Sequence, residues 1–269
     1  MPEPLINLLA AVWTDTLVLA ADLTEDEWNR STDCPGWSVK DHVAHMIGTE
    51  NMLEGEQPPP ADIGDAAHVR NDIGTFNEQW VAVYRDRPGK EALDDFRVIT
   101  DRRLATLRAL PAEEWEKEGF TPEGPGPYRQ FMEIRVFDCW FHDQDMREAL
   151  NRQGFLEGPA ADLSLGRIPP KGLPYVVGKK AGAPQGSSVV FDVTGAPPIV
   201  AAISVEGRAA LLDAPPADPT TTLTMDRRTF GRLAGGRWNG DRARVAGTVQ
   251  VGGDVELGNR VLDNMAFTI

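Results

Sequence analysis

Residues 135–147 read Arg-Val-Phe-Asp-Cys-Trp-Phe-His-Asp-Gln-Asp-Met-Arg. The polar residues Arg135, Asp138, His142 and Asp145 follow one another at steps of three or four, which places them on one face of a helix. Large apolar side chains flank this polar row, so the helix is predicted to be buried. Burying the row without partners would cost several kcal/mol. The segment therefore predicts a core helix whose polar face is compensated by something else.

A metal ion is one candidate for that compensation. Asp138 and His142 are spaced i, i+4, so that both side chains can bind one ion, and a histidine from a facing helix would complete a three-ligand site. The chain has only four histidines, and two of them, His42 and His45, lie three residues apart in another predicted helix. Helical periodicity does not decide between these two. The simpler alternative is a weak ion pair on a solvated helix face.

Helical patterns fill the first half of the chain. A short capped helix is expected after Thr24, where Glu27 completes a capping box. The stretch 121–127 is rich in Pro and Gly and is predicted to be a loop. Long helices joined by modest loops predict a helical bundle over residues 1–153. The long helices are expected at 5–21, 38–53, 72–87, 90–110 and 128–152.

After Gly154 the pattern changes to short β-rich runs separated by Gly and Pro. A short helix is expected at 227–234 and a last one at 257–264. Residues 154–269 are therefore predicted to form a smaller α+β domain, and the whole chain belongs to the α+β class. The strands are expected at 187–194, 199–205, 209–213, 220–225 and 243–251.

Composition excludes several classes of function. Lys and Arg total 27 against 41 Asp and Glu, a formal net charge of −14, which disfavours binding to nucleic acid or to anionic membranes. The apolar runs are expected to be too short for the roughly 20 residues that span a bilayer, and no secretion signal is recognised. Two cysteines, Cys34 and Cys139, are too few for a disulfide framework, and Cys139 is predicted to be a core thiol. These features predict a cytoplasmic location.

The stretches 34–46 and 135–147 together resemble the mycothiol-dependent maleylpyruvate isomerase family of the DinB-like metalloenzyme superfamily. The resemblance implies a DinB-like four-helix bundle that binds zinc through His45, Asp138 and His142, and it favours His45 over His42. Some members carry Glu where this chain has the shorter Asp138. Asp145 matches a polar position one turn beyond the second histidine, and we expect it to orient His142 or to take part in catalysis.

The second half is similar to sterol-carrier-protein-like domains, most clearly in the glycine-rich stretches 231–237 and 247–254. Six arginines stand out there in an otherwise acidic chain. One hypothesis is that they bind an anionic substrate, and the alternative is that most of them are solvated. They are Arg227, Arg228, Arg232, Arg237, Arg242 and Arg244.

The resemblance implies an open position on zinc that accepts the thiol of mycothiol, whose thiolate then attacks a small electrophile as a transferase or an isomerase. Another divalent metal suits the same ligands. Two alternatives stay open: a metal-binding or apolar-ligand carrier without catalysis, and a hydrolase in which Asp145 or Glu50 is the base. The expected partners are a small thiol and a small electrophile. The sequence predicts no oligomeric state.

Overall fold

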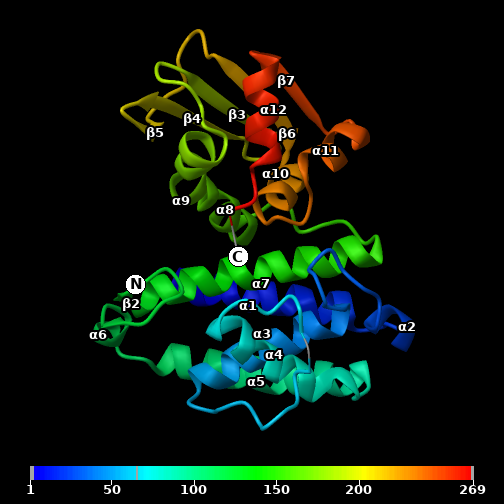
Figure 1. Ribbon diagram of the computed structural model, residues 1–269. Coiled ribbons are helices and arrows are strands. Elements are labelled where there is room, and N and C mark those ends of the chain that lie inside the picture. The colour runs from blue at the N-terminus through cyan, green and yellow to red at the C-terminus, as the bar shows by residue number, and fades with distance from the viewer. Residues whose placement is uncertain (1–2, 65, 268–269) are drawn as a thin grey trace. The chain divides into compact units, whose positions relative to one another are not determined.

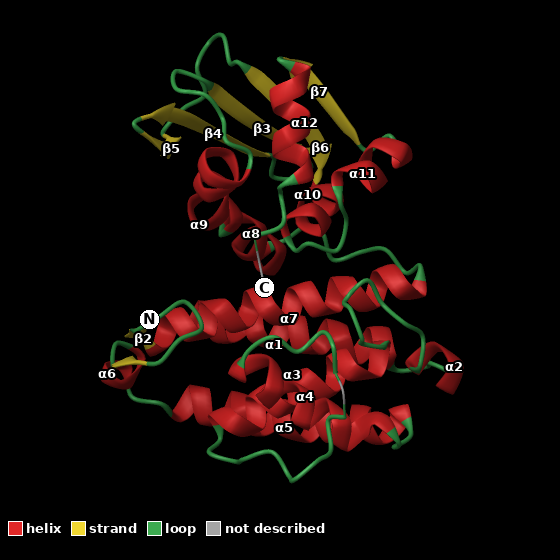
Figure 2. Ribbon diagram, in the orientation of Figure 1, coloured by secondary structure: helices red, strands yellow, loops and turns green. Residues whose placement is uncertain are grey.

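The computed structural model describes residues 3–64 and 66–267, which divide into two compact units, Met1–Phe155 and Leu156–Ile269 (Figure 1). The predicted break after residue 153 lies two residues from this division. The first unit is helical and the second contains a sheet (Figure 2), so the predicted α+β class is confirmed. Each unit is described separately below.

The first unit is a bundle of long helices. Helix α3 contacts α4, α5 and α7, and α1 contacts α5 and α7. The predicted long helices are confirmed, with ends that move by about two residues. Two small elements were not predicted: helix α6, and a two-stranded ribbon of β1 (Glu118–Gly119) and β2 (Gly126–Pro127) around the expected loop. The helices are α1 (Glu3–Ala20), α2 (Glu25–Trp28), α3 (Val39–Leu53), α4 (Asp72–Arg85), α5 (Gly89–Ala109), α6 (Ala112–Trp115) and α7 (Tyr128–Leu150).

Capping boxes fix where the helices near the site begin. The side chain of Ser38 accepts a hydrogen bond from the backbone N–H of Asp41, and the Asp41 carboxylate accepts one from the backbone N–H of Ser38. The predicted box of Thr24 and Glu27 starts α2 in the same way. Such caps satisfy backbone donors that a helix leaves unpaired. The cap at Ser38 therefore fixes the start of α3 just before His42 and His45.

Helix α1 differs from the expectation that no apolar run is long enough to cross a membrane. By length and composition alone its 18 residues are long and apolar enough. In the structure, Ile6, Leu9 and Trp13 are buried in the bundle, where α1 packs against α5 and α7. The hydroxyl of Thr16 also donates a hydrogen bond to Asp143 on α7, at 3.2 Å. Helix α1 is thus a core helix of this unit.

The second unit is built on a five-stranded sheet with the order β5-β4-β3-β6-β7. Strand β3 pairs parallel with β6, whereas the other neighbours are antiparallel. Phe191 at its centre is opposite Ala201 and Leu223, and all three are buried. The strands are β3 (Ser188–Thr194), β4 (Ile199–Glu206), β5 (Arg208–Leu212), β6 (Thr221–Asp226) and β7 (Val249–Gly253). The helices are α8 (Pro159–Gly166), α9 (Ile168–Tyr175), a π-helical turn (Val176–Lys180), α10 (Arg227–Ala234), α11 (Gly240–Ala246) and α12 (Val255–Asp263).

The predicted strand over 243–251 is wrong in its first half. Residues Gly240–Ala246 form helix α11, and only Val249–Gly253 is a strand. Asn239 caps this helix by accepting a hydrogen bond from the backbone N–H of Arg242. Gly247, at a φ of 66°, ends it in the left-handed conformation that favours glycine. The cap and the terminating glycine thus divide a stretch whose composition resembles one strand.

Candidate metal centre

Helices α3 and α7 bring the three predicted metal ligands together. One ligand atom from each of His45, Asp138 and His142 lies within 4.8 Å of the others. Nε2 of His45 is 3.2 Å from Oδ2 of Asp138, and Nε2 of His142 is 3.5 Å from Oδ1. Each imidazole therefore directs its Nε2 toward the carboxylate of Asp138. Two nitrogens and one oxygen suit zinc and several other divalent metals.

The surroundings of these side chains also fit a cation. His45 and His142 are buried, whereas 30% of the Asp138 side chain is exposed, so the group is accessible from one side. Nδ1 of His45 is buried without a hydrogen-bond partner among the residues that the structure describes. The carboxylate of Asp138 faces both imidazoles and also binds the guanidinium of Arg135. The donor set thus fits a divalent metal with at least one open position.

Burial and charge shift the pKa values of the three groups in different directions. Burial would raise the pKa of Asp138, but Arg135, His142 and His45 outweigh it and hold that pKa well below its usual range. Burial lowers the pKa of His45, and the attraction of Asp138 only partly opposes this. Burial also acts against the charged form of His142, but Asp138 and Asp145 outweigh it and raise its pKa. In the absence of a metal, His142 is thus the imidazole that favours a proton.

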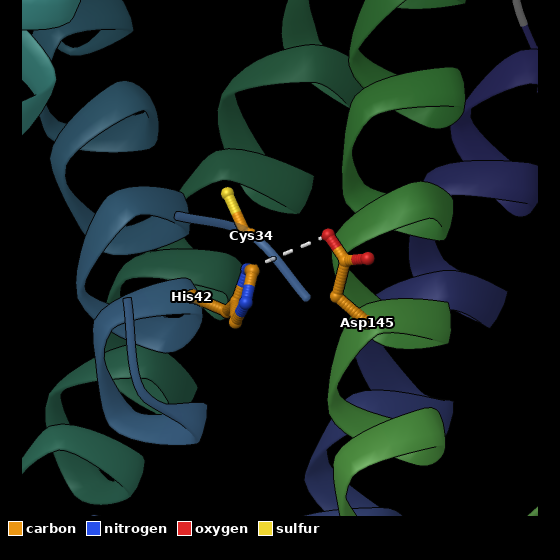
Figure 3. Close-up of side chains that lie close together, drawn as sticks. All are labelled: Cys34, His42 and Asp145. Carbon is orange, nitrogen blue, oxygen red and sulfur yellow. Dashed lines mark ion pairs between the residues drawn. The ribbon is translucent and has the colours of Figure 1, made fainter. Parts of the chain in front are cut away.

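His42 has different neighbours from His45, although the sequence left the two histidines as alternatives. Its Nδ1 lies 2.9 Å from Nδ1 of His142, and its Nε2 lies 2.9 Å from Oγ1 of Thr32. It also belongs to a second group with Cys34 and Asp145, whose possible ligand atoms lie within 4.8 Å of one another. Figure 3 shows the carboxylate of Asp145, on α7, directed toward His42, with Cys34 nearby.

Asp145 lies beside the histidines but at longer distances. Its Oδ2 is 3.6 Å from Nδ1 of His142 and 4.0 Å from Nδ1 of His42. These distances allow ion pairing, but the nearer hydrogen-bonding partner of His142 is His42 at 2.9 Å. The sequence indicated His42 only as an alternative to His45 in the ligand set. Its three-residue spacing from His45 was the signal that it lies near the site, and the catalytic role of Asp145 stays a prediction.

Trp37 forms an aromatic wall of the site that the sequence did not predict. Its ring centroid is 5.4, 5.2 and 5.5 Å from those of His42, His45 and His142. The indole Nε1 donates a hydrogen bond to Glu78 on α4, at 3.2 Å. Because Trp37 and Glu78 are 41 residues apart, no local pattern reveals this contact.

Glu78 holds the Trp37 wall in place through several partners. It is buried and also contacts Nε2 of His68 at 2.9 Å and the guanidinium of Arg85. Burial would raise the pKa of Glu78, but hydrogen bonds from His68 and Trp37 outweigh it and lower the pKa. The imidazole of His68 lies against Gly36, where an added Cβ would be 2.4 Å from Nδ1. Glycine is thus favoured at position 36 for two reasons: its φ of 79° lies in the left-handed region, and a side chain there would clash with His68.

A buried charge network extends from Asp138 into the bundle. The guanidinium of Arg135 donates hydrogen bonds to Asp138 and, at 2.8 and 2.9 Å, to Oε1 of Glu50 on α3. The other oxygen of Glu50 accepts a hydrogen bond from Arg103 on α5, at 3.1 Å. Arg103 reaches Tyr128 as well, at 2.8 Å. These contacts compensate part of the polar row on α7, and they hold both oxygens of Glu50, which disfavours it as a base.

The six arginines of the second unit have more than one role. Arg227 donates to the carbonyl oxygen of Ala196 and pairs with Asp162. Arg244 pairs with Asp241 and Asp263 at 2.7 and 2.6 Å. These two arginines therefore stabilise their own unit.

Two others, Arg228 and Arg242, place their guanidinium carbons 4.8 and 4.7 Å from the ring centroid of Trp238. Such stacking on an indole is a favourable cation–π contact. Binding of an anionic substrate by any of the six stays a hypothesis.

Loss of the Glu50 charge is expected to destabilise the first unit strongly. In Glu50→Gln, the buried Arg103 and Arg135 lose the carboxylate between them, which should lower the free energy of unfolding by about 3–5 kcal/mol. The matched control is Glu56→Gln, whose partner Arg102 is solvent-exposed, with an expected loss below about 1 kcal/mol. Urea unfolding followed by helical circular dichroism measures both. Equal losses in the two variants would contradict the structural role given to Glu50.

Comparison with known families agrees with the two-unit organisation. Residues 9–147 match the mycothiol maleylpyruvate isomerase N-terminal domain family. Residues 179–263 match the SCP-2 sterol transfer family.

Solved structures show the same fold over almost the whole chain. A mycothiol-dependent maleylpyruvate isomerase superimposes with a TM-score of 0.57 and 15% identity, and the match covers 93% of this chain and 92% of that chain. A histidine-to-alanine mutant of such an enzyme gives a TM-score of 0.59 and 14% identity, with the same coverage. At these identities the likeness concerns the fold.

Two uncharacterized proteins from strains of Mycobacterium tuberculosis are 26% identical over 151 residues. The match covers 55% of this chain and 57% of each relative. The family match covers more than half of the chain, including all three predicted metal ligands. The chain therefore belongs to the mycothiol maleylpyruvate isomerase family, with an SCP-2-type domain after the bundle.

Proposed function

We propose that this protein is a metal-dependent enzyme that uses a small thiol, mycothiol, to attack a small electrophilic substrate. The observation that carries the proposal is the convergence of His45, Asp138 and His142 in a chain that belongs to this family. Zinc is the proposed metal, although the ligand set also suits other divalent ions. Both partners are small molecules, and the cytoplasm, where thiols stay reduced, is the proposed location.

The metal would be held by His45 and Asp138 from opposite helices and by His142 one turn beyond Asp138. When bound, it would lower the pKa of the thiol, so that a thiolate forms at neutral pH. The exposed edge of Asp138 leaves a path for the thiol from solvent. Trp37 packs against the imidazoles of His45 and His142 and would restrict their movement on that side. Arg135 holds one oxygen of Asp138 and so restricts the rotation of its carboxylate.

Asp145 is not a proposed metal ligand. Its proposed role is electrostatic, through the effect of its negative charge on His142. It is fully buried, and its carboxylate lies 3.6 Å from Nδ1 of His142. A negative charge there favours a proton on Nδ1. Attack by the thiolate yields either a stable conjugate, as in a transferase, or an adduct that rotates and expels the thiol, as in an isomerase. Both outcomes begin with the same step.

A carrier of apolar ligands is the second candidate, because residues 179–263 match the SCP-2 sterol transfer family. The two candidates differ in what the first unit must do. A carrier needs neither the metal ligands nor a thiol, whereas the proposed enzyme needs both.

Metal content is the first test. We expect about one zinc per chain in the purified protein by mass spectrometry, and loss of that zinc in His45→Ala and His142→Ala, because each removes one of three ligands. His68→Ala is the control, since His68 pairs with Glu78 and lies outside the ligand group. Zinc retained in both ligand variants, or absent from the wild type, would refute the proposed centre.

Turnover is the second test. Zinc-loaded protein with mycothiol is expected to isomerise maleylpyruvate or to conjugate an aromatic halide, and chelation of the metal should abolish the reaction. Omission of the thiol should do the same, because the thiolate is the nucleophile. The product distinguishes isomerase from transferase. Thiol-independent turnover would instead favour a hydrolase, and no turnover with tight binding of a fluorescent acyl probe would favour the carrier.

Metal affinity should depend on pH through His142. Its pKa is raised above the ordinary value of 6.5, and the proton must leave before a metal binds. Apparent affinity is therefore expected to rise with pH, by up to about tenfold per unit, until the pH passes that pKa. His45, whose pKa is lowered, should add no step above pH 6.5. Chelator competition across this range measures the dependence, and a constant affinity would contradict it.

A further inference from the structure

We propose that His42 and Thr32 are positioning residues that fix the tautomer of His142, so that Nε2 of His142 is the metal-binding nitrogen. This inference rests on the proposed metal centre and adds a set of groups that acts behind it. The contacts that carry it form one continuous chain, from the backbone carbonyl of Trp37 through Thr32 and His42 to His142.

The direction of this chain is set at its outer end. The carbonyl oxygen of Trp37 can only accept, so the hydroxyl of Thr32 must donate to it, at 3.1 Å. A hydroxyl has one proton, so Oγ1 of Thr32 acts as an acceptor toward its other neighbours. The backbone N–H of Cys34 donates to it at 3.1 Å, and Nε2 of His42 lies 2.9 Å away. Nε2 of His42 therefore carries the proton of that contact.

The same direction continues to His142. A neutral imidazole with a proton on Nε2 has an unprotonated Nδ1, which accepts. Nδ1 of His42 lies 2.9 Å from Nδ1 of His142, so the proton of that contact belongs to His142. In neutral His142 with the proton on Nδ1, the lone pair is on Nε2, which faces Asp138 at 3.5 Å. The chain thus directs a lone pair of His142 into the ligand group.

Burial and packing keep His42 in this arrangement. His42 is fully buried, and its ring makes an edge contact with Trp37 at 5.4 Å between centroids. The ring of His142 is 4.9 Å away. The carboxylate of Asp145, at 3.6 Å from Nδ1 of His142, also favours a proton at that nitrogen. Partners of this kind typically change metal affinity by about 10–100-fold when removed.

The same series of hydrogen bonds argues against a second metal ion beside the first. Cys34, His42 and Asp145 have the residue types and spacing to bind an ion of their own. If Nδ1 of His42 accepts from His142, its lone pair is occupied and does not serve a second ion toward Asp145. The proposal therefore requires one metal ion per protein molecule, and two metal ions would contradict it.

The test compares zinc affinity, by chelator competition, among matched variants. His42→Leu should weaken zinc binding about 10–100-fold, and Thr32→Val should weaken it less. The double variant should bind as His42→Leu does, because Thr32 acts only through His42. Thr32→Ser, which keeps the hydroxyl, should bind zinc with the affinity of the wild type. Thr49→Val is the control, since this buried hydroxyl on α3 donates to the backbone carbonyl of His45.

Nitrogen-15 NMR of the zinc-loaded wild type gives a readout that needs no variant and no activity. The expected spectrum shows His142 protonated at Nδ1 and His42 at Nε2. Protonation of His142 at Nε2, a Thr32→Val effect that persists in His42→Leu, or a second zinc lost in Cys34→Ser would overturn the inference. A wild type that binds no zinc refutes the proposed function itself. Normal zinc binding with no effect of His42→Leu refutes only the positioning role.

Discussion

The carboxylate of Asp138 is the group on which the arrangement of the site depends. Two imidazoles and a guanidinium contact it, His45 from α3 and His142 and Arg135 from α7. Of these contacts only the one with His45 crosses from α7 to α3, and the pair of Arg135 with Glu50 links the same two helices a second time. The three cationic or potentially cationic neighbours also keep this carboxylate ionised in a largely buried place. The same charge that orders the bundle is therefore the one that attracts a metal ion.

The ion pairs of Asp138 are part of a network that extends from the site into the interior of the bundle. Arg135 links Asp138 to Glu50, and Glu50 links Arg135 to Arg103 on α5. Such buried networks contribute little net stability compared with a well-packed apolar core, but breaking one of their pairs costs much. Three helices are thus tied together by groups that tolerate few other partners. We interpret the network as the scaffold that holds the Asp138 side of the centre rigid while its outer edge stays open to solvent.

The sequence predicted those parts of the fold and site that depend on local spacing. The i, i+4 pair of Asp138 and His142, the capping box of Thr24 and most helix ends follow from a few neighbouring residues, and the structure has them close to where they were expected. Contacts between distant segments had no such signal. The wall formed by Trp37 depends on Glu78, and the polar row on α7 is compensated by Glu50, 85 residues away from Arg135.

The short loop before α3 has a consequence for how the centre assembles. Its ends are tied by a bridge between Ser31 and Ser38, and Thr32 bonds to both Trp37 and His42, all within a dozen residues. Contacts this local close small loops, which cost little entropy. The loop and the first turns of α3 can therefore order early, as a preformed half of the pocket. Docking of α7 would then complete it in a single step, with Asp138 and His142 arriving together.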